Sequence, residues 1–314
     1  MPNIQNAGSP HLDKIAPVDA GIFAIDTDYV RARQDASHLI VDSGKAAFVD
    51  TGTNFSVPTL ERALREQGLG TGDVEFIMLT HVHLDHAGGA GLLAQRCPQA
   101  RVLVHPRGAA HLIDPGKLIA GTRAVYGDAA YERLYGDIRP IPEERIEQLA
   151  DGERRRLGRR CFEFLHTPGH ALHHLCIAER EAGVVFSGDT FGVSYREFDN
   201  ANGEFVMPTT TPTQFDPQQL HASVERILAL RPRSVFMTHY SRVDSVARIG
   251  ADMHADIDRY VAIAMAHAAR EDRLARIRDD VREHTWERLR AHGHAGGDAR
   301  AVELLGGDIE LNAA

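Results

Sequence analysis

The chain has 314 residues, of which 43% are hydrophobic and 25% are charged. A chain of this length and composition can bury a sizeable core, as one large domain or two smaller ones, so disordered, collagen-like and coiled-coil proteins are excluded. The net charge is −9, from 35 basic and 44 acidic residues. A net negative charge repels the phosphate backbone of nucleic acid, so we expect no nucleic-acid partner.

Neither a membrane span nor a signal peptide is indicated. No segment approaches the roughly 20 consecutive apolar residues that a membrane helix needs, and the N-terminal sequence MPNIQNAGSPHLDKIAPVD lacks a basic start followed by an apolar stretch. We therefore expect a cytoplasmic protein that does not engage a membrane. The three scattered cysteines, Cys97, Cys161 and Cys176, fit buried thiols in a reducing compartment.

The first hundred residues alternate between strand and helix patterns. The runs GIFAID, HLIVD, AAFVD, VEFIMLT and RVLVH are typical of strands. Between them, Val57, Leu60 and Leu64 share one face of a predicted helix. Pro58 lies in the first turn of this helix and Gly68 lies just past its end, which are the usual start and stop signals.

The rest of the chain adds helices around four further strands. Residues 106–147 read as helical segments broken by Pro and Gly, and we predict a helical insertion over one face. The strands CFEFLH, HLCIAE, GVVFSGD and SVFMTH follow, and residues 247–292 are helical, with a Gly- and Ala-rich end that we expect to fray. The predicted domains are residues 1–246, which contain the insertion, and a C-terminal helical extension over residues 247–314.

The most closely spaced candidate metal ligands lie in residues 80–89, which read THVHLDHAGG and follow the predicted strand FIML. Residues two apart at a strand end point the same way, so His81 and His83 can hold one metal ion. Asp85 and His86, where the chain turns into a helix, point toward a second ion. A His-rich surface loop is the alternative, but four candidate ligands in six residues favour a metal site with two ions.

Three later residues also follow apolar strands: His170 in HTPGH, Asp189 in FSGDT and His239 in MTHY. Each alone is more typical of a hydrogen-bonded structural residue. Strand ends of this kind meet at one edge of the sheets, which is how a site is assembled from distant parts of a sequence. Together with THVHLDH they indicate one shared site.

These motifs, with VDTGT at residues 49–53, occur in an order that resembles the metallo-β-lactamase superfamily, in the hydrolase branch that includes glyoxalase II and acylhomoserine lactonases. The resemblance covers about residues 21–240. It implies an α/β fold, a four-layer αββα sandwich of two facing sheets between helical layers, with metal ions at the edge of the sheets.

The resemblance also implies a set of ligands. The first ion would be held by His81, His83 and His170, the second by Asp85, His86 and His239, and Asp189 would bridge both. A carboxylate between two cations neutralises their repulsion and leaves room for a shared water that supplies hydroxide. Since every ligand is His or Asp, two divalent transition-metal ions are expected, with zinc favoured and iron or manganese acceptable.

Further residues near these motifs receive predicted roles. Asp85 and Asp189 are the expected catalytic carboxylates, because either could handle the proton of the leaving group. Asp50 in VDTGT and His174 after the TPGH motif are expected to orient ligands. Candidates for contact with a substrate are His173, Tyr195 and Arg196, although a mobile loop is an equal interpretation of the last two.

The predicted function is that of a binuclear metallohydrolase that cleaves an ester, thioester or lactone bond of a small molecule by metal-bound hydroxide. A persulfide-dioxygenase-like enzyme with one iron and a regulatory effector with vestigial hydrolysis are the alternatives. The segment after Asp189 lacks the Lys- and Arg-bearing pattern that binds glutathione in glyoxalase II, and Gly192 stands where acylhomoserine lactonases have Tyr.

The predicted helices over residues 247–292 carry an apolar stripe, formed by Ile249, Met253, Ile257, Val261 and Met265. Together with residues 106–147, these helices are predicted to form a cover that sets substrate choice. Packing on the core, or a homodimer interface, is the equally weighted alternative, because an apolar helix face is normally buried against something.

Overall fold

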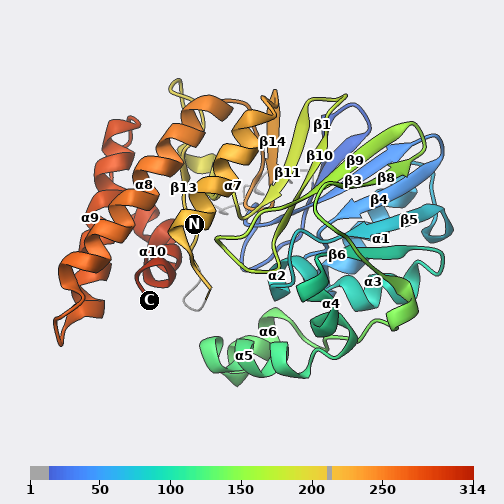
Figure 1. Ribbon diagram of the computed structural model, residues 1–314, viewed down its shortest axis with the longest axis horizontal. Coiled ribbons are helices and arrows are strands. Elements are labelled where there is room, and N and C mark those ends of the chain that lie inside the picture. Colours follow the sequence, from blue (N-terminus) through green and yellow to red (C-terminus); the bar gives the residue numbers. More distant parts are fainter. Residues whose placement is uncertain (1–13, 211–213) are drawn as a thin grey trace, which may run out of the picture.

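The computed structural model describes residues 14–210 and 214–314. Most of the N-terminal stretch that argued against a signal peptide, residues 1–13, lies outside the described residues. Two β-sheets face each other at the centre, and helices cover the outer face of each (Figure 1). The predicted four-layer αββα sandwich is therefore confirmed.

The first sheet contains seven strands in chain order. The four N-terminal strands pair antiparallel, and the remaining pairs are parallel. Alternation places Ala46 and Phe48 against the helices and Ala47 and Val49 against the second sheet. The strands are β1 (Ile15–Asp19), β2 (Ile22–Asp26), β3 (Ala36–Asp42), β4 (Lys45–Val49), β5 (Val74–Met78), β6 (Arg101–Val104) and β7 (Ile146–Gln148).

The second sheet has six strands in the order β15-β14-β11-β10-β9-β8. Large side chains from its inner face, among them Phe162, Phe164, Phe186 and Phe236, fill the space between the two sheets. Its strands are β8 (Glu153–Leu157), β9 (Arg160–His166), β10 (Leu175–Glu179), β11 (Val184–Gly188), β14 (Ser234–Met237) and β15 (Ser241–Val243), and a separate pair is formed by β12 (Val193–Ser194) and β13 (Val206–Met207).

The helical layers bury one apolar face each. The predicted helix after Ser56 is α1 (Val57–Glu66), and it packs Val57, Leu60 and Leu64 on the first sheet. This layer also contains α3 (Ala90–Arg96) and α4 (Pro106–Ile113), while α7 (Pro217–Ala229) and α8 (Val246–His267) cover the second sheet. Short elements are α2 (Leu84–Ala87), η1 (Asn54–Ser56), η2 (Thr71–Asp73), η3 (Glu143–Arg145) and η4 (Arg196–Phe198).

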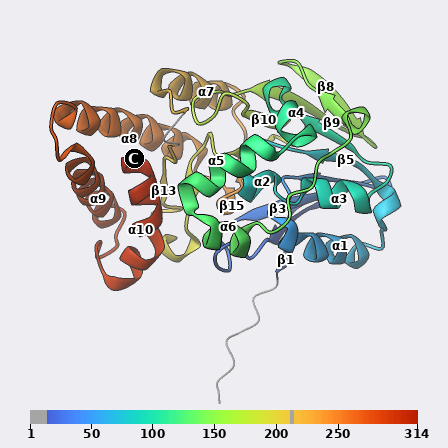
Figure 2. The same ribbon diagram turned by 90° about the horizontal axis from the view of Figure 1, so that it is seen from below.

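The predicted insertion is shorter than residues 106–147. Beyond α4, it forms α5 (Gly116–Tyr126) and α6 (Asp128–Leu134), which lie next to α2 in both views (Figures 1 and 2). Its last residues are β7, in which Ile146 pairs with Val102 of β6. Three residues are too few for a strand pattern to be recognised in the sequence, because pairing with β6 decides their conformation.

The expectation that the C-terminus frays is wrong. After α9 (Arg273–Ala291), residues Ala299–Ala313 form α10, whose N-terminus is capped by the Asp298 side chain accepting from the Ala301 N–H. Leu304, Leu305 and Ile309 of α10 pack with Trp286 and Leu289 of α9. The stabilisation from burying this apolar face therefore exceeds the cost of placing glycines in the helix.

The apolar stripe on α8 packs on the core, as the alternative to a substrate cover requires. Ile249 and Met253 are buried against the outer face of the second sheet. Met265, the last residue of the predicted stripe, is 72% exposed, so the stripe is not buried over its whole length. Whether the protein forms a homodimer stays a prediction, as does the domain boundary at residue 246.

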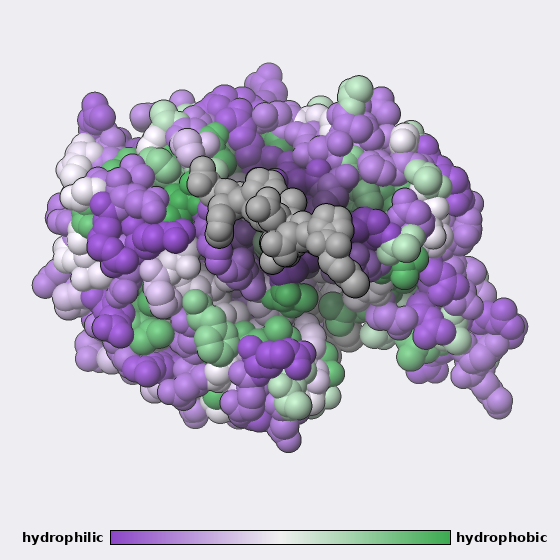
Figure 3. Space-filling model, turned by 180° about the vertical axis from the view of Figure 1, so that it is seen from behind, coloured by the Kyte–Doolittle hydropathy of each residue, from purple (hydrophilic) through white to green (hydrophobic). Residues whose placement is uncertain are grey.

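One face of the molecule is mainly polar (Figure 3). Figure 3 shows a face on which hydrophilic residues dominate and hydrophobic ones gather in small separate patches. No helix within residues 14–210 and 214–314 is both long and apolar enough to cross a membrane. Cys97, Cys161 and Cys176 carry free thiols, of which Cys97 and Cys176 are buried.

One buried histidine makes the fold sensitive to acid. His38 of β3 packs edge-on against Phe186 and Phe236, with its Nε2 3.1 Å from the Ser241 hydroxyl. Burial lowers the pKa of His38 from 6.5 to about 4. Between these two pKa values the unfolded chain binds the proton and the folded chain does not, so stability is full above pH 6.5 and is lost as the pH falls toward 4.

We therefore predict that His38→Gln flattens the acid branch of the stability curve. The wild type should lose about 3 kcal/mol more free energy of unfolding than the variant between pH 7 and pH 4, since about 2.5 pKa units separate the two states. Urea unfolding of chelator-treated proteins measures this difference, and His221→Gln serves as the control at a partly exposed position. Equal losses in wild type and His38→Gln would contradict the prediction.

Candidate metal centre

The strand ends named above meet at one edge of the molecule. In the first sheet β4 and β5 are parallel, and in the second sheet β9, β11 and β14 run in one direction, so their carboxyl ends lie together. This edge gathers all the predicted ligands, in two groups whose donor atoms lie within 4.8 Å of one another: His81, His83, His170 and Asp189 in one, and Asp85, His86 and His239 in the other.

In the first group three imidazoles converge on a carboxylate. The Nδ1 atom of His83 lies 2.9 Å from Nε2 of His81 and 3.2 Å from Nε2 of His170. The same His170 Nε2 atom is 3.2 Å from Oδ2 of Asp189. The ring nitrogens thus face a common centre, as ligands of one cation do.

In the second group two imidazoles face two carboxylates. Nε2 of His86 and Nε2 of His239 lie 3.5 Å and 3.6 Å from Oδ2 of Asp85. The same two nitrogens are 3.2 Å and 3.3 Å from Oδ1 of Asp189. Asp189 therefore directs one carboxylate oxygen to each group.

The buried carboxylate of Asp50 joins the two sheets at this point. It accepts three hydrogen bonds of 2.8 Å, from the Thr80 N–H, the Thr80 hydroxyl and the Thr238 hydroxyl. Thr80 follows a strand of the first sheet and Thr238 follows a strand of the second. Its Oδ2 also lies 2.8 Å from Nδ1 of His86. With a proton on Nδ1, His86 turns Nε2 toward the second group, so this contact is compatible with the orienting role expected of Asp50, which stays a prediction.

The structure supplies partners for two other histidines. The Thr209 carbonyl lies 3.1 Å from Nδ1 of His170, and Asn312 of α10 holds the neighbouring residue by accepting from the Thr210 N–H at 2.8 Å. Oδ1 of Asp35 lies 2.6 Å from Nδ1 of His239. Asp35 lies in the β2–β3 loop without any motif, so only the folded structure identifies it.

His174 positions the backbone of Asp189. Its Nε2 accepts from the Asp189 N–H at 3.1 Å, and its Nδ1 lies 2.9 Å from the Thr167 hydroxyl. Gly188, just before Asp189, has a φ of +48°, and a Cβ there would lie 2.6 Å from the His174 ring. Only glycine fits this close approach, which explains the glycine of the SGDT motif.

The two groups differ in charge preference. Burial lowers the pKa of His81, His83 and His170, so these imidazoles are uncharged at neutral pH, which is the form that binds a metal ion. Burial also opposes a charge on His86, but the carboxylates of Asp189, Asp85 and Asp50 outweigh it and hold the pKa of His86 well above 6.5. Nε2 of His86 and Oδ1 of Asp189 are buried, and neither makes a hydrogen bond within the described residues.

The three predicted substrate contacts occupy different environments. His173 is buried beside the first group, with its ring 5.5 Å from the ring of His83, and burial lowers its pKa to about 3. The Tyr195 hydroxyl contacts Asp308 of α10, and Arg196 donates to the Arg242 carbonyl at 3.0 Å. Their contact with a substrate stays a prediction.

Two tyrosines, Tyr135 of the insertion and Tyr29 of the β2–β3 loop, contact each other near Asp85, and we call this pair the tyrosine wall. The sequence did not reveal it. Leu84, between His83 and Asp85 in the chain, packs with Tyr135 of the segment that follows α6. The hydroxyl of Tyr135 is 2.6 Å from that of Tyr29 in the β2–β3 loop. The negative charge of Asp85 adds to the effect of burial in raising the pKa of both tyrosines.

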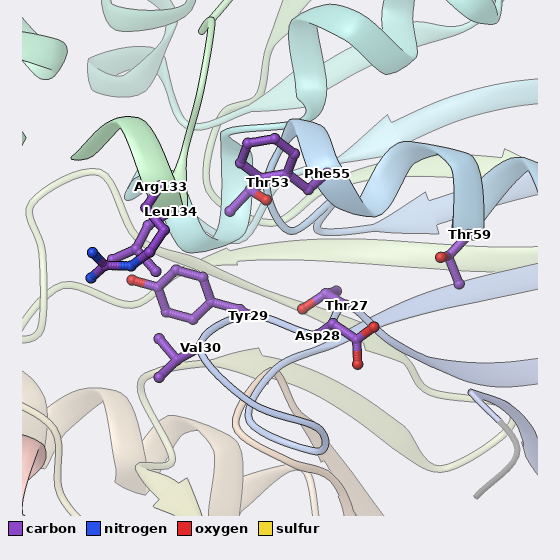
Figure 4. Close-up of a pocket in the computed structure, with 9 residues that line it drawn as sticks. All are labelled: Thr27, Asp28, Tyr29, Val30, Thr53, Phe55, Thr59, Arg133 and Leu134. Carbon is purple, nitrogen blue, oxygen red and sulfur yellow. The ribbon is translucent and has the colours of Figure 1, made fainter. Parts of the chain in front are cut away.

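A small cavity adjoins this wall. It has a volume of about 180 Å³, and the side chains of Tyr29, Phe55 and Leu134 border it, together with Thr53 of the VDTGT motif (Figure 4). Phe55 is 60% exposed, which is unusual for a large apolar side chain. The insertion contributes Arg133 and Leu134 to the border of this cavity.

Several known proteins resemble parts of this chain. A protein of Sulfurisphaera tokodaii named metallo-beta-lactamase fold-containing protein ST1585 is 30% identical over 170 residues, which are 53% of this chain and 60% of that protein. A hydroxyacylglutathione hydrolase of Stenotrophomonas maltophilia is 35% identical over 48% of this chain and 44% of its own length. An acyl-coenzyme A thioesterase of Gallus gallus, MBLAC2, is 27% identical over 55% and 64%. The chain thus spans about half the length of these curated relatives.

Solved structures and a family model agree with the fold. The crystal structure of ST1585 superposes with a TM-score of 0.65 at 22% identity, over 94% of this chain and 97% of the other. The Thermus thermophilus protein TTHA1429 superposes with a TM-score of 0.62 at 23% identity, over 79% and 83%. The family model of the metallo-beta-lactamase superfamily matches residues 30–239, so the chain belongs to this superfamily.

Proposed function

We propose that this protein is a metal-dependent hydrolase that holds two divalent transition-metal ions and cleaves an ester, thioester or lactone bond of a small molecule. The observation that carries the proposal is the position of Asp189, whose two carboxylate oxygens face two separate groups of donor atoms. A site for a single iron, as in the persulfide-dioxygenase alternative, leaves the second group without a role.

The residues fit such ions. The donors are imidazole nitrogens and carboxylate oxygens, a set that suits zinc best and also iron and manganese. The buried Nε2 of His86 and Oδ1 of Asp189, which have no hydrogen-bond partner within the described residues, point into the site as ligand atoms do. When bound, two such ions supply a Lewis acid for a carbonyl oxygen and lower the pKa of a coordinated water toward neutrality.

The chain itself orients the donors and handles the proton. Asp50, Asp35 and the Thr209 carbonyl face the outer ring nitrogens of His86, His239 and His170, so that the inner nitrogens stay turned toward the centre. Asp85 lies at the rim of the site with 21% of its side chain exposed. A carboxylate in this position can pass a proton to the departing group of the substrate.

The surroundings favour an acyl compound as substrate. Tyr29, Phe55 and Leu134 provide apolar surface for part of an acyl group, in a cavity whose other lining residues are mainly polar. Among the relatives, one is named as a hydroxyacylglutathione hydrolase and another as an acyl-coenzyme A thioesterase. Thioesters are therefore the first substrate class to test, before lactones and simple esters.

The metal content of three variants tests the two-ion assignment. Wild-type protein supplied with zinc should contain two ions per chain, His239→Ala should retain one, and Asp189→Ala should lose affinity for both, because a bridging carboxylate serves both ions. Elemental analysis after gel filtration measures the content, with His267→Ala as the control outside the site. One ion in the wild type, or unchanged content in Asp189→Ala, would refute the assignment.

The role of Asp50 can be measured separately. In Asp50→Asn the side chain can no longer accept from all its donors, so His86 loses its orientation, and we expect the affinity for the second zinc ion to fall about 10- to 100-fold. Competition with a chromophoric chelator measures both zinc affinities, and the exposed Asp128→Asn variant is the control. Unchanged second-ion affinity would show that Asp50 has only a structural role.

A further inference from the structure

A second pocket lies where the β2–β3 loop, η4 and α10 meet. Its volume is about 420 Å³, and four of its lining residues are arginines: Arg31, Arg33, Arg196 and Arg300, alongside Glu197 and Glu303. We call it the basic pocket. In a chain with a net charge of −9, this lining carries two more positive than negative charges.

Both carboxylates of the basic pocket are already engaged. Oε1 of Glu197 accepts from Nη1 of Arg31 at 2.9 Å and lies 3.3 Å from Nη2 of Arg300. Oε2 of Glu303 lies 2.8 Å from Nη1 of Arg300. These two glutamates therefore pair with Arg31 and Arg300, and no carboxylate of the lining is left for Arg33 and Arg196. Outside the lining, Oδ2 of Asp199 lies 3.3 Å from Nη1 of Arg196.

Three donor groups of the basic pocket remain without an acceptor. Nη2 of Arg31 and Nε of Arg196 are buried, and neither makes a hydrogen bond within the described part of the chain. No carboxylate in residues 14–210 or 214–314 forms an ion pair with Arg33. A buried donor without an acceptor is costly, and guanidinium groups pair most strongly with carboxylate or phosphate oxygens, so the lining is suited to an oxyanion.

The basic pocket is tied to the candidate metal centre by the β2–β3 loop. Asp35, which contacts His239 at 2.6 Å, is only two residues from Arg33, so the two Cα atoms lie at most about 7 Å apart. The Arg31 guanidinium lies over the Tyr195 ring, 5.0 Å from its centre. One short loop thus carries both the support of a candidate ligand and two of the guanidinium groups.

We infer that the basic pocket is a subsite for a phosphate group carried by the substrate, which it binds while the bond to be cleaved lies at the metal centre. This inference rests on the proposed function and adds to it a substrate class, a phosphate-bearing acyl thioester or ester. Phosphate fits because its oxygens can accept from several guanidinium forks at once.

The test compares two thioesters of the same acyl group on the zinc-loaded enzyme, a coenzyme A thioester with phosphates and an N-acetylcysteamine thioester without them. We expect Arg33→Gln to lower kcat/KM at least tenfold for the first, through KM, and to leave the second unchanged. Arg33→Lys, which keeps the charge, should recover part of the loss, and Arg159→Gln, whose side chain is 86% exposed at the β8–β9 turn, is the control.

Calorimetric binding of pyrophosphate to the same proteins gives a readout independent of turnover. Arg33→Gln should weaken the binding of pyrophosphate to the basic pocket at least tenfold. Any pyrophosphate that binds to the metal ions should still bind to the variant. Unchanged pyrophosphate binding overturns the oxyanion site. Weakened binding with an unchanged preference between the two thioesters overturns the substrate subsite and indicates a site for free phosphate. Failure to cleave either thioester refutes the proposed function, while the binding result still decides the oxyanion site.

Discussion

The hydrogen bonds of the Asp50 carboxylate hold the two sheets and the candidate site in one arrangement. Thr80 follows β5 of the first sheet and Thr238 follows β14 of the second, and both hydroxyls donate to this one side chain. The sheets are joined again nearby, where the Ala36 N–H donates to the Thr238 carbonyl at 2.7 Å. Because the candidate ligands His81 and His239 directly follow Thr80 and Thr238, the spacing of the ligand groups follows from these contacts.

Elements remote in the sequence complete the site. Helix α10 holds Thr210 through Asn312, next to the carbonyl that faces His170, and it brings Asp308 to the Tyr195 hydroxyl. The insertion adds Tyr135, which packs with Leu84 of the THVHLDH motif. The core motifs therefore supply the candidate ligands, whereas the added helices contact the residues around them.

The sequence was most informative where a short motif and a strand end coincide. The helix after Ser56 and the sandwich fold were predicted correctly, and the structure brings the seven candidate ligands together in two groups, because the residues that decide these features are close in the chain or follow apolar strands. Their role as ligands stays a prediction. Asp35 was missed, as were the tyrosine wall and α10. Asp35 and the tyrosines act through contacts between distant segments, and the Gly- and Ala-rich composition of α10 concealed an apolar face that only its packing on α9 reveals.

The central claim is that Asp189 lies between two metal ions. Crystals of the zinc-loaded protein, with anomalous diffraction recorded at the zinc edge, test it most directly. The account predicts two anomalous peaks about 3.5–4 Å apart, one beside each carboxylate oxygen of Asp189. A single peak, or two peaks of which only one adjoins Asp189, would contradict it.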